Sequence, residues 1–185
     1  MEKPEPKSTI CESLRLILRR FDENDAEAIF KFRGDPHVMR FSVSGPESRE
    51  DIRMKYLPSC VKRYARDGFG QWAVIRKSDG NCIGECGICA QKVDGSPEYE
   101  ISYRLRRDCW GQGLATEAAQ ACRDYGFKQI GLTRMISIIE PENVASIRVA
   151  EKMGMTLEKR ASFHDIAALI YSITYLSAPT SIKKC

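Results

Sequence analysis

The sequence predicts an α/β domain built on a mixed sheet, and three features of the chain carry this prediction. Residues 72–105 have the pattern of an antiparallel meander, in which strands are joined by short turns. Residues 114–125 then place apolar side chains along one face of a helix. The nearly all-apolar segment 135–139 is typical of a strand covered on both faces, and a helix over 144–153 and a closing pair of strands ending at 169–175 follow it.

Strands alternate apolar and polar positions in the first part of the chain. Residues 14–19 predict a first strand, and residues 72–75 and 82–89 predict a hairpin around the turn Ser78–Asn81. In the next strand, 99–105, Ile101, Tyr103 and Leu105 share one face, and Glu100, Ser102 and Arg104 share the other.

Two helical stretches are expected between the first strand and this meander. The first spans residues 26–32, with Asp22 and Asn24 as candidate N-caps and Gly34 as its end. Ser48 caps the second. Pro58 interrupts this second stretch, which predicts either two short helices or one kinked helix.

Length and charge place the chain among single-domain globular proteins. Its 185 residues predict one domain over 9–176, a disordered tail over 1–8 and a loose tail over 177–185. The net charge of +4 is modest for a nucleic-acid binder, and no segment approaches the ~20 apolar residues of a membrane span. Because the start also lacks the apolar region of a signal peptide, a cytosolic location is expected, without nucleic-acid or membrane partners.

Eight cysteines raise the question of a metal site or disulfides. Cys82, Cys86 and Cys89 lie closest together, but they fall inside a predicted strand and no histidine is near them. In a reducing compartment free cysteine behaves as a small apolar residue. The pattern therefore favours structural thiols and no metal centre.

The segment Trp110–Thr116 joins a predicted strand to the start of a helix. Gly111 and Gly113 lack side chains and can adopt positive φ, so successive backbone N–H groups can face a ligand at the positive end of the helix dipole. A pyrophosphate suits such a site, although a tight strand-to-helix turn would need the same glycines.

A dinucleotide is the nearest alternative ligand for this loop. The Gly-x-Gly-x-x-Gly fingerprint requires glycine or alanine at position 116, where Thr116 stands. It also requires a parallel βαβ unit, whereas this loop follows an antiparallel meander. Glu140, after the next strand, would have to act as the ribose-binding carboxylate. These departures disfavour a dinucleotide.

Trp110–Ala115 resembles the Arg/Gln-x-x-Gly-x-Gly/Ala motif by which the GNAT superfamily of N-acetyltransferases binds acetyl-coenzyme A. Tryptophan at the first position departs from the superfamily consensus and is typical of the RimJ/RimL-like branch, the ribosomal-protein N-terminal acetyltransferases and their relatives. Further segments are similar to that branch, and the resemblance extends over about residues 9 to 176. They are Leu14–Arg19, Asp35-Pro36, Tyr99–Leu105, Thr116–Ala118, Asn143–Ser146, Glu151–Met155, Asp165 and Tyr171–Thr174.

The resemblance implies a mostly antiparallel GNAT-like fold, whose strand at 100–105 splays from a parallel neighbour at 134–139. Pantetheine would lie in the resulting slot and pair with the backbone of residues 101–105. The cofactor-binding residues that it implies are Ile101, Tyr103, Leu105, Trp110, Gly111, Gln112, Gly113, Leu114, Ala115, Thr116, Asn143 and Ser146. Asn143 can equally be only a helix cap.

Acetyl transfer to an amine requires a base, and Glu100 beside the proposed slot is the main candidate, with Glu98 and Asp165 in reserve. A solvated strand carboxylate is the alternative role for Glu100. Many GNAT enzymes carry a tyrosine acid at the position of Ala150. In the RimJ/RimL-like branch the resemblance assigns that role to Ser146, which on structural grounds can merely support the start of its helix.

The function expected from these residues is acetyl transfer from acetyl-coenzyme A to a primary amine, either a small molecule or a protein or peptide N-terminus, by a monomer or homodimer. A non-catalytic sensor of acyl-coenzyme A with the same fold is the alternative, because Ala150 replaces the tyrosine. Acceptor specificity is expected from residues 41–64 and 163–168. His37 and His164 have no spacing typical of a metal site or a catalytic triad.

Overall fold

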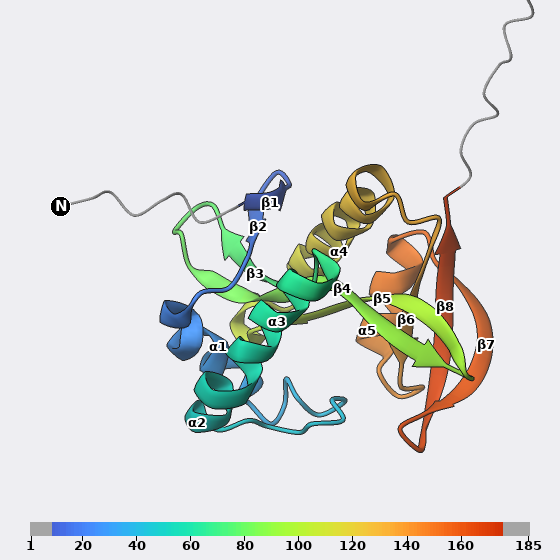
Figure 1. Cartoon of the computed structure of the whole chain (residues 1–185), viewed down its shortest axis with the longest axis horizontal. Helices are drawn as coiled ribbons and strands as arrows, with labels where there is room; N and C mark the ends of the chain where they lie inside the picture. Colours follow the sequence, from blue (N-terminus) through green and yellow to red (C-terminus); the bar gives the residue numbers. More distant parts are fainter. Residues whose placement is uncertain (1–8, 176–185) are drawn as a thin grey trace, which may run out of the picture.

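The computed structural model describes residues 9–175, so both predicted tails, 1–8 and 177–185, lie outside the described residues. One sheet contains eight strands in the order β1-β2-β3-β4-β5-β6-β8-β7 (Figure 1). The strands are β1 Thr9–Glu12, β2 Leu16–Arg19, β3 Gln71–Arg76, β4 Cys82–Val93, β5 Ser96–Leu105, β6 Arg134–Ile139, β7 Thr156–Phe163 and β8 Ile166–Thr174. Neighbouring strands are antiparallel except β5 and β6, which run parallel. The predicted mixed sheet is thus confirmed.

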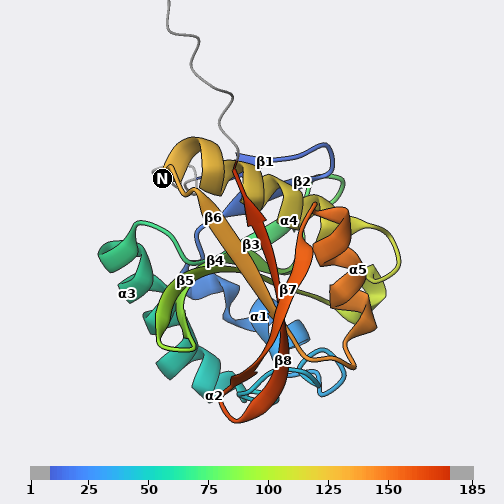
Figure 2. The same ribbon diagram turned by 90° about the vertical axis from the view of Figure 1, so that its right-hand side faces the viewer.

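Helices cover both faces of this sheet. They are α1 Ala26–Arg33, α2 Arg49–Asp51, α3 Leu57–Asp67, α4 Leu114–Tyr125 and α5 Val144–Lys152. Figure 2 shows α3 and α5 on opposite sides of the strands. The first eight residues of β4 are all buried, as expected for a central strand with helices on both faces.

Pro58 shapes the second helical stretch without breaking it. The chain is helical without interruption from Arg49 to Asp67, and a π-helical segment, Ile52–Tyr56, separates α2 from α3. Pro58 is near the start of α3, directly after the π-helical segment, and its missing N–H removes one hydrogen bond to the preceding turn. The wider π-turn immediately before it is where the run adjusts to the proline ring.

The parallel pair β5–β6 parts soon after it forms. Its only paired position is Glu100 opposite Ile136. The Ser137 hydroxyl then donates to the Ile101 carbonyl at 2.9 Å, so a side chain replaces the next rung of the backbone ladder. Beyond this point the strands diverge, as the splayed pair of the predicted fold requires.

Two predictions for the N-terminal third need correction. The predicted strand 14–19 begins at Leu16, because residues 13–15 form the turn between β1 and β2. The strand β1 was not predicted, because it is a four-residue edge strand without a buried side chain and therefore lacks the alternation that marks a half-buried strand. Residues 34–48 form turns, so the acceptor segment predicted around 41–64 becomes helical only at Arg49.

Candidate active site

The glycine-bearing loop is open to solvent. Residues 110–113 are all exposed, and a Cβ added at Gly111 would meet nothing within 4 Å. Gly111 and Gly113 have φ values of 73° and 74°, which only glycine adopts without strain. Gly113 caps α4 without a side-chain hydrogen bond, so the first-turn N–H groups after it are available to an anion.

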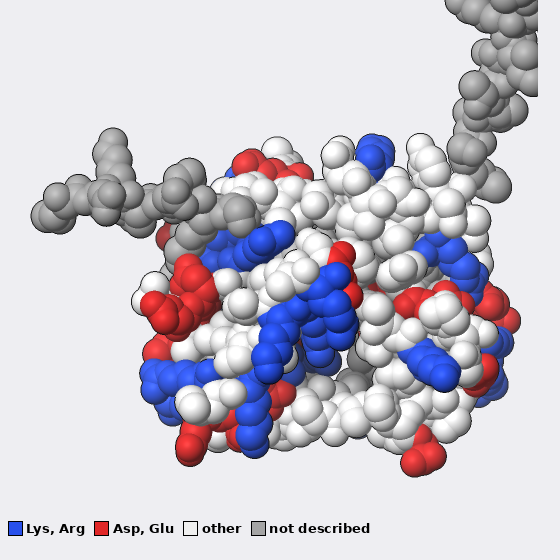
Figure 3. Space-filling view, in the orientation of Figure 1, with Lys and Arg blue, Asp and Glu red and all other residues white. Residues whose placement is uncertain are grey.

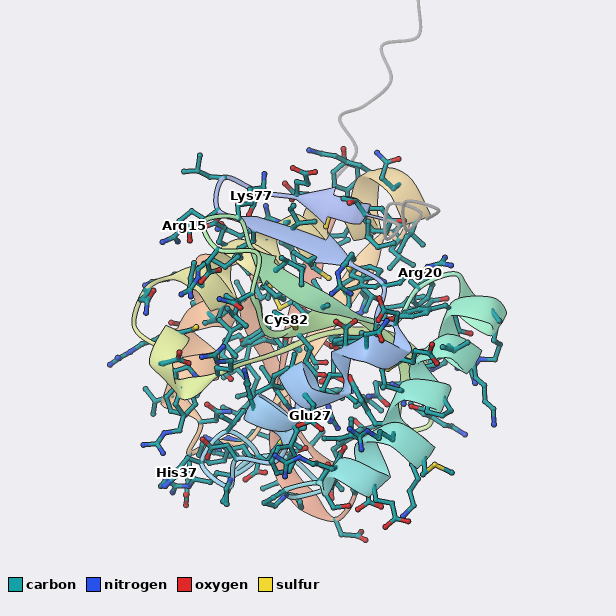
Figure 4. The ribbon with its side chains drawn as sticks, turned by 90° about the vertical axis from the view of Figure 1, so that its left-hand side faces the viewer. Arg15, Arg20, Glu27, His37, Lys77 and Cys82 are labelled. Carbon is teal, nitrogen blue, oxygen red and sulfur yellow. The ribbon has the colours of Figure 1, made fainter. Side chains whose placement is uncertain are left out.

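Arg15 and Glu117 hold this loop against the first hairpin. The Arg15 guanidinium donates through Nη1 to the Gln112 carbonyl at 3.1 Å and through Nε to Glu117 at 2.6 Å. The Glu117 carboxylate also accepts from the Arg15 backbone N–H and the Ser13 hydroxyl, each at 2.7 Å. Burial alone would raise the pKa of Glu117, but these hydrogen bonds outweigh it and lower the pKa. Figure 4 shows Arg15 at the end of the hairpin, beside Lys77.

The slot between β5 and β6 offers one residue with free backbone groups on its edge. The Ile101 carbonyl faces β6, since it accepts from Ser137, and alternation along the strand turns the backbone of Tyr103 and Leu105 to the same side. The Leu105 carbonyl is engaged by the Trp110 indole at 2.8 Å. Pairing with pantetheine, predicted for all three residues, is therefore best supported at Tyr103, which lies between the two engaged carbonyls.

Asn143 and Ser146 sit at the N-terminus of α5, across the slot from β5. The Asn143 carbonyl oxygen Oδ1 accepts from the Ser146 N–H at 3.1 Å, so Asn143 is the helix cap that the sequence left open as an alternative. The Tyr103 hydroxyl donates to the Ser146 carbonyl at 3.0 Å and ties β5 to α5. The Asn143 amide nitrogen and the Ser146 hydroxyl take no part in these contacts and remain candidates for a ligand.

Glu100 lies on the other face of β5, in a cavity of about 300 Å³. The cavity is bounded by α3, by residues 41–44 and by the tip of the β7–β8 hairpin at 163–168, and Figure 3 shows a hollow beside α3 with Lys and Arg side chains along its rim. Ser102 and Arg104 line it together with Glu100, as the predicted alternation along the strand requires. The two segments expected to select the acceptor therefore lie around the candidate base.

The surroundings of Glu100 suit a proton acceptor. Burial raises the pKa of this carboxyl above its ordinary value, although the hydrogen bond from Gln91 Nε2, at 2.7 Å, attraction to Arg104 and the hydrogen bond from the Ile138 backbone N–H act in the opposite direction. The Ile138 contact places the carboxylate at the parting of β5 and β6. Neither reserve base is so placed, because Glu98 is paired with Arg134 and Asp165 is exposed at the hairpin tip.

A buried charge network supports the wall of the cavity. The fully buried Glu85 carboxylate accepts from Arg33 at 2.6 Å, from Arg104 at 2.8 Å and from the Tyr56 hydroxyl. Burial alone would raise the pKa of Glu85, but attraction to the two guanidinium groups outweighs it and lowers the pKa. Arg33 is also bound in a bidentate manner by Glu47, at 3.0 and 2.6 Å.

The remaining candidates from the sequence lie elsewhere. His37 is exposed on the loop after α1 (Figure 4), and His164 is exposed at the hairpin tip, where it lines the cavity mouth. Cys82, Cys86 and Cys89 are buried in β4, and burial raises the pKa of Cys82 to about 11. Within residues 9–175 no group of three or more potential ligand side chains is arranged to hold a metal ion. None of the helices in this range has the length and apolar character of a membrane span.

The charged groups that surround the loop and the cavity have no local signal in the sequence. Arg15 and Glu117 are separated by about a hundred residues in the chain, and Arg33 and Glu85 by about fifty, so no local spacing brings them together. The alternation of β5 was a usable signal for Arg104 alone, since it places that residue on the face of Glu100.

Comparison with known proteins identifies the family. The model of the acetyltransferase (GNAT) domain matches residues 15–156. The uncharacterized protein YkkB of Bacillus subtilis is 37% identical over 148 residues, which cover 78% of this chain and 84% of YkkB. A GNAT-family acetyltransferase structure from Bacillus anthracis is 30% identical, with a TM-score of 0.74 over 89% of this chain and 97% of that one.

A third comparison supports the fold alone. RimL, the ribosomal L7/L12 alpha-N-protein acetyltransferase solved in complex with coenzyme A, is 21% identical with a TM-score of 0.76, covering 90% of this chain and 98% of RimL. The family match extends over the glycine loop, the slot and most of the strands around the cavity. The chain belongs to the GNAT acetyltransferase family.

Proposed function

We propose that this protein transfers an acetyl group from acetyl-coenzyme A to a primary amine, with the cofactor's pyrophosphate held by the backbone of Trp110–Thr116. The observation that carries the proposal is the connection between two sites. The exposed loop and α5 lie on one side of the sheet, the Glu100 cavity lies on the other, and the parting of β5 and β6 joins them. A thioester that enters along the slot would meet an amine from the cavity.

The residues present fit this cofactor. The positive φ of Gly111 and Gly113 and the open space at Gly111 leave room for phosphate oxygens at the N-terminus of α4. Tyr103 offers backbone groups to the pantetheine arm, and the Asn143 amide nitrogen is a further donor for that arm. The half-exposed side chain of Trp110 would form part of its wall, whereas the side chains of Ile101, Leu105 and Leu114 are buried in the core behind it.

Glu100 acts as the base in this proposal. The amine nitrogen forms a bond to the thioester carbonyl carbon, the carbon–sulfur bond breaks, and the amine proton passes to the Glu100 carboxylate, directly or through water. Because burial raises the pKa of Glu100, its conjugate acid is less strongly acidic and proton transfer to it is easier than to a solvated carboxylate. Holding the two reactants in one slot supplies a further, entropic part of the acceleration.

Departure of the thiolate needs little help. An ordinary thiol has a pKa near ~8.5, so a hydrogen bond from the Ser146 hydroxyl is sufficient stabilisation in our proposal. Ala150, which stands where many relatives carry a tyrosine acid, is fully buried in α5. The position is part of the core in this chain, which shifts the role of hydrogen-bond donor to Ser146.

An amine of low pKa is the acceptor whose deprotonation by a single carboxylate base costs the least free energy. Freeing a lysine amine from its proton at pH 7 costs roughly 4.6 kcal/mol, whereas freeing an α-amine costs about 1 kcal/mol. We therefore place a protein or peptide N-terminus, or a similar small amine, ahead of lysine side chains. Membership of the RimJ/RimL-like branch, favoured by Trp110 and the segments that resemble it, points the same way.

Product analysis tests this function. The protein is incubated with acetyl-coenzyme A and a mixture of peptides, amino acids and amines, and acetylated products are identified by mass spectrometry while calorimetry measures coenzyme A binding. Acetylation of an amine that depends on the enzyme supports the proposal. Tight coenzyme A binding without any product would instead support the acyl-coenzyme A sensor.

A further inference from the structure

The arginines around the cavity differ in how fully their charge is neutralised. Arg33 is saturated, because Glu47 and Glu85 together take three of its nitrogens. Arg104 shares Glu85 with Arg33, and its Nη2 reaches only the neutral Ser42 hydroxyl, at 3.2 Å. The Glu85 carboxylate thus accepts from two guanidinium groups, and the Nη2 donor of Arg104 has no anionic partner within residues 9–175.

Arg63 of α3 forms no ion pair with any residue between 9 and 175. Its one hydrogen-bond contact is with the Cys89 thiol, at 3.9 Å, although the residue is partly buried and lines the cavity. Asp67, one turn further along α3, attracts Arg63, but its carboxylate is held by Arg66 at 2.6 Å, so the Arg63 guanidinium keeps donors that an anionic ligand can occupy. Its planar set of donors fits a carboxylate or a phosphate.

Two carboxylates also line the cavity. They are Glu100 on β5 and Glu140 after β6, and Glu100 is attracted by Arg104, which lies on the same face of β5. Cys89 is the cross-strand partner of Glu100 and the contact of Arg63. Arg63 and Glu100 therefore lie on either side of Cys89.

We infer that the acceptor amine carries an anionic group a few bonds away, and that Arg63, assisted by Arg104, binds that group while the amine faces Glu100. This inference rests on the proposed function and names the class of its acceptor. An acidic N-terminal residue, a free amino acid or an amino sugar phosphate has this arrangement of charges. A polyamine does not, because its second ammonium group would face Arg63 at close range in a poorly solvated cavity.

Matched acceptor pairs test the inference. The first pair is the tripeptide amides Asp-Ala-Ala and Asn-Ala-Ala, which tests a carboxylate. The second pair is glucosamine 6-phosphate and glucosamine, which tests a phosphate. Spermidine is the cationic probe. We expect the anionic member of at least one pair to have a kcat/KM about tenfold or more above its neutral partner, with spermidine the poorest acceptor.

The Arg63→Gln variant should remove this preference. It should lower kcat/KM for the anionic acceptor about tenfold and leave the neutral acceptor unchanged. Arg53→Gln is the matched control, because Arg53 lies in the same helical run, pairs with Glu27 and does not line the cavity. Equal rates within both pairs, or an equal loss for both members in Arg63→Gln, would overturn the inference.

A binding measurement separates this inference from the proposed function. Calorimetry with the same amines is carried out in the presence of coenzyme A, where no acetyl group can be transferred. If no amine is acetylated but the anionic probes still bind wild type more tightly than Arg63→Gln, the proposed function fails and the binding of the anion stands. If neither turnover nor binding distinguishes the charges, Arg63 is a solvated surface arginine and the inference is wrong.

Discussion

Arg15 and Glu117 form a two-point contact that joins the turn after β1 to the first turn of α4. The Arg15 backbone N–H and its Nε both donate to the Glu117 carboxylate, at 2.7 and 2.6 Å. The same guanidinium reaches the Gln112 carbonyl, so the contact fixes the loop that we assign to the cofactor's pyrophosphate. A turn at the edge of the sheet thereby positions backbone N–H groups that belong to a distant part of the chain.

Loss of this contact should weaken cofactor binding. Glu117→Gln removes the charge that orients Arg15, and we expect the Kd for coenzyme A to rise about tenfold, because the loop N–H groups are no longer held in place. Isothermal titration calorimetry measures the effect. Lys77→Gln is the control, since Lys77 pairs with Glu12 in the same region without touching the loop. Equal Kd values in the two variants would show that Glu117 does not position the loop.

Gly113→Val should abolish coenzyme A binding while the domain stays folded. A β-branched residue at a φ of 74° is strained, and its side chain would project beside Arg15 on the ligand side of the loop. Gly80→Val carries the same backbone strain, at a φ of 69°, in the turn between β3 and β4. Circular dichroism should show both variants folded, and only Gly80→Val should bind. Retained affinity in Gly113→Val would refute the assignment of the loop.

Glu100→Gln should lower kcat about a hundredfold or more with little change in the Kd for coenzyme A, because the amide cannot accept the amine proton. The active form of Glu100 is the carboxylate, so wild-type kcat should rise with pH through the raised pKa of this group, above the range of an ordinary glutamate. The variant should lack this acidic limb. Unchanged turnover would remove Glu100 as the base.

Glu100→Gln should lower turnover without lowering stability. A carboxyl whose pKa is raised by folding is bound to its proton more tightly in the folded state, so its contribution to stability is lost as pH rises through that pKa. Glu100→Gln removes this loss. We therefore expect the variant's Tm at pH 8 to equal or exceed that of wild type, measured by differential scanning calorimetry. A lower Tm would mean that the ionised carboxylate stabilises the fold.

Glu85→Gln should destabilise the protein strongly. It leaves Arg33 and Arg104 beside a neutral amide in a buried site, and breaking such an arrangement costs about 3 kcal/mol or more. Because folding lowers the pKa of Glu85, its contribution is present at neutral pH and is lost as pH falls below the ordinary range of glutamate. Urea unfolding at pH 7 and pH 4 measures this. A variant as stable as wild type at pH 7 would contradict it.

Local patterns were sufficient for most of the fold. Gly34 ends α1 and Ser48 caps α2 as predicted, since each acts on backbone groups within a few residues. Of the two candidate N-caps, Asp22 caps the short 3-10 turn just before α1, and Asn24 lies within that turn, so the predicted start was correct to within a turn. The strand β4 runs four residues beyond the predicted end at Cys89, because its pairing with β5 continues to Val93 opposite Ser96. That extension depends on a partner strand and has no local signal.

In the candidate site, too, the features with a local sequence signal were predicted and those that depend on tertiary contacts were not. The glycine loop and the face of Glu100 followed from glycine placement and strand alternation, both of which are local. The engagement of the Leu105 carbonyl by Trp110 depends on how the chain turns after β5, and the pairing of Glu85 with Arg33 depends on packing α1 against β4. Neither contact could be predicted, because each depends on the three-dimensional arrangement of its segments and no local sequence pattern indicates it.

A crystal structure of the protein with coenzyme A tests the central claim most directly. We predict pyrophosphate oxygens within hydrogen-bond distance of the backbone N–H groups of residues 111–116, with the pantetheine arm along Tyr103 and its sulfur at the parting of β5 and β6, near Glu100. A pyrophosphate bound elsewhere, with the loop empty and the slot closed, would contradict the account.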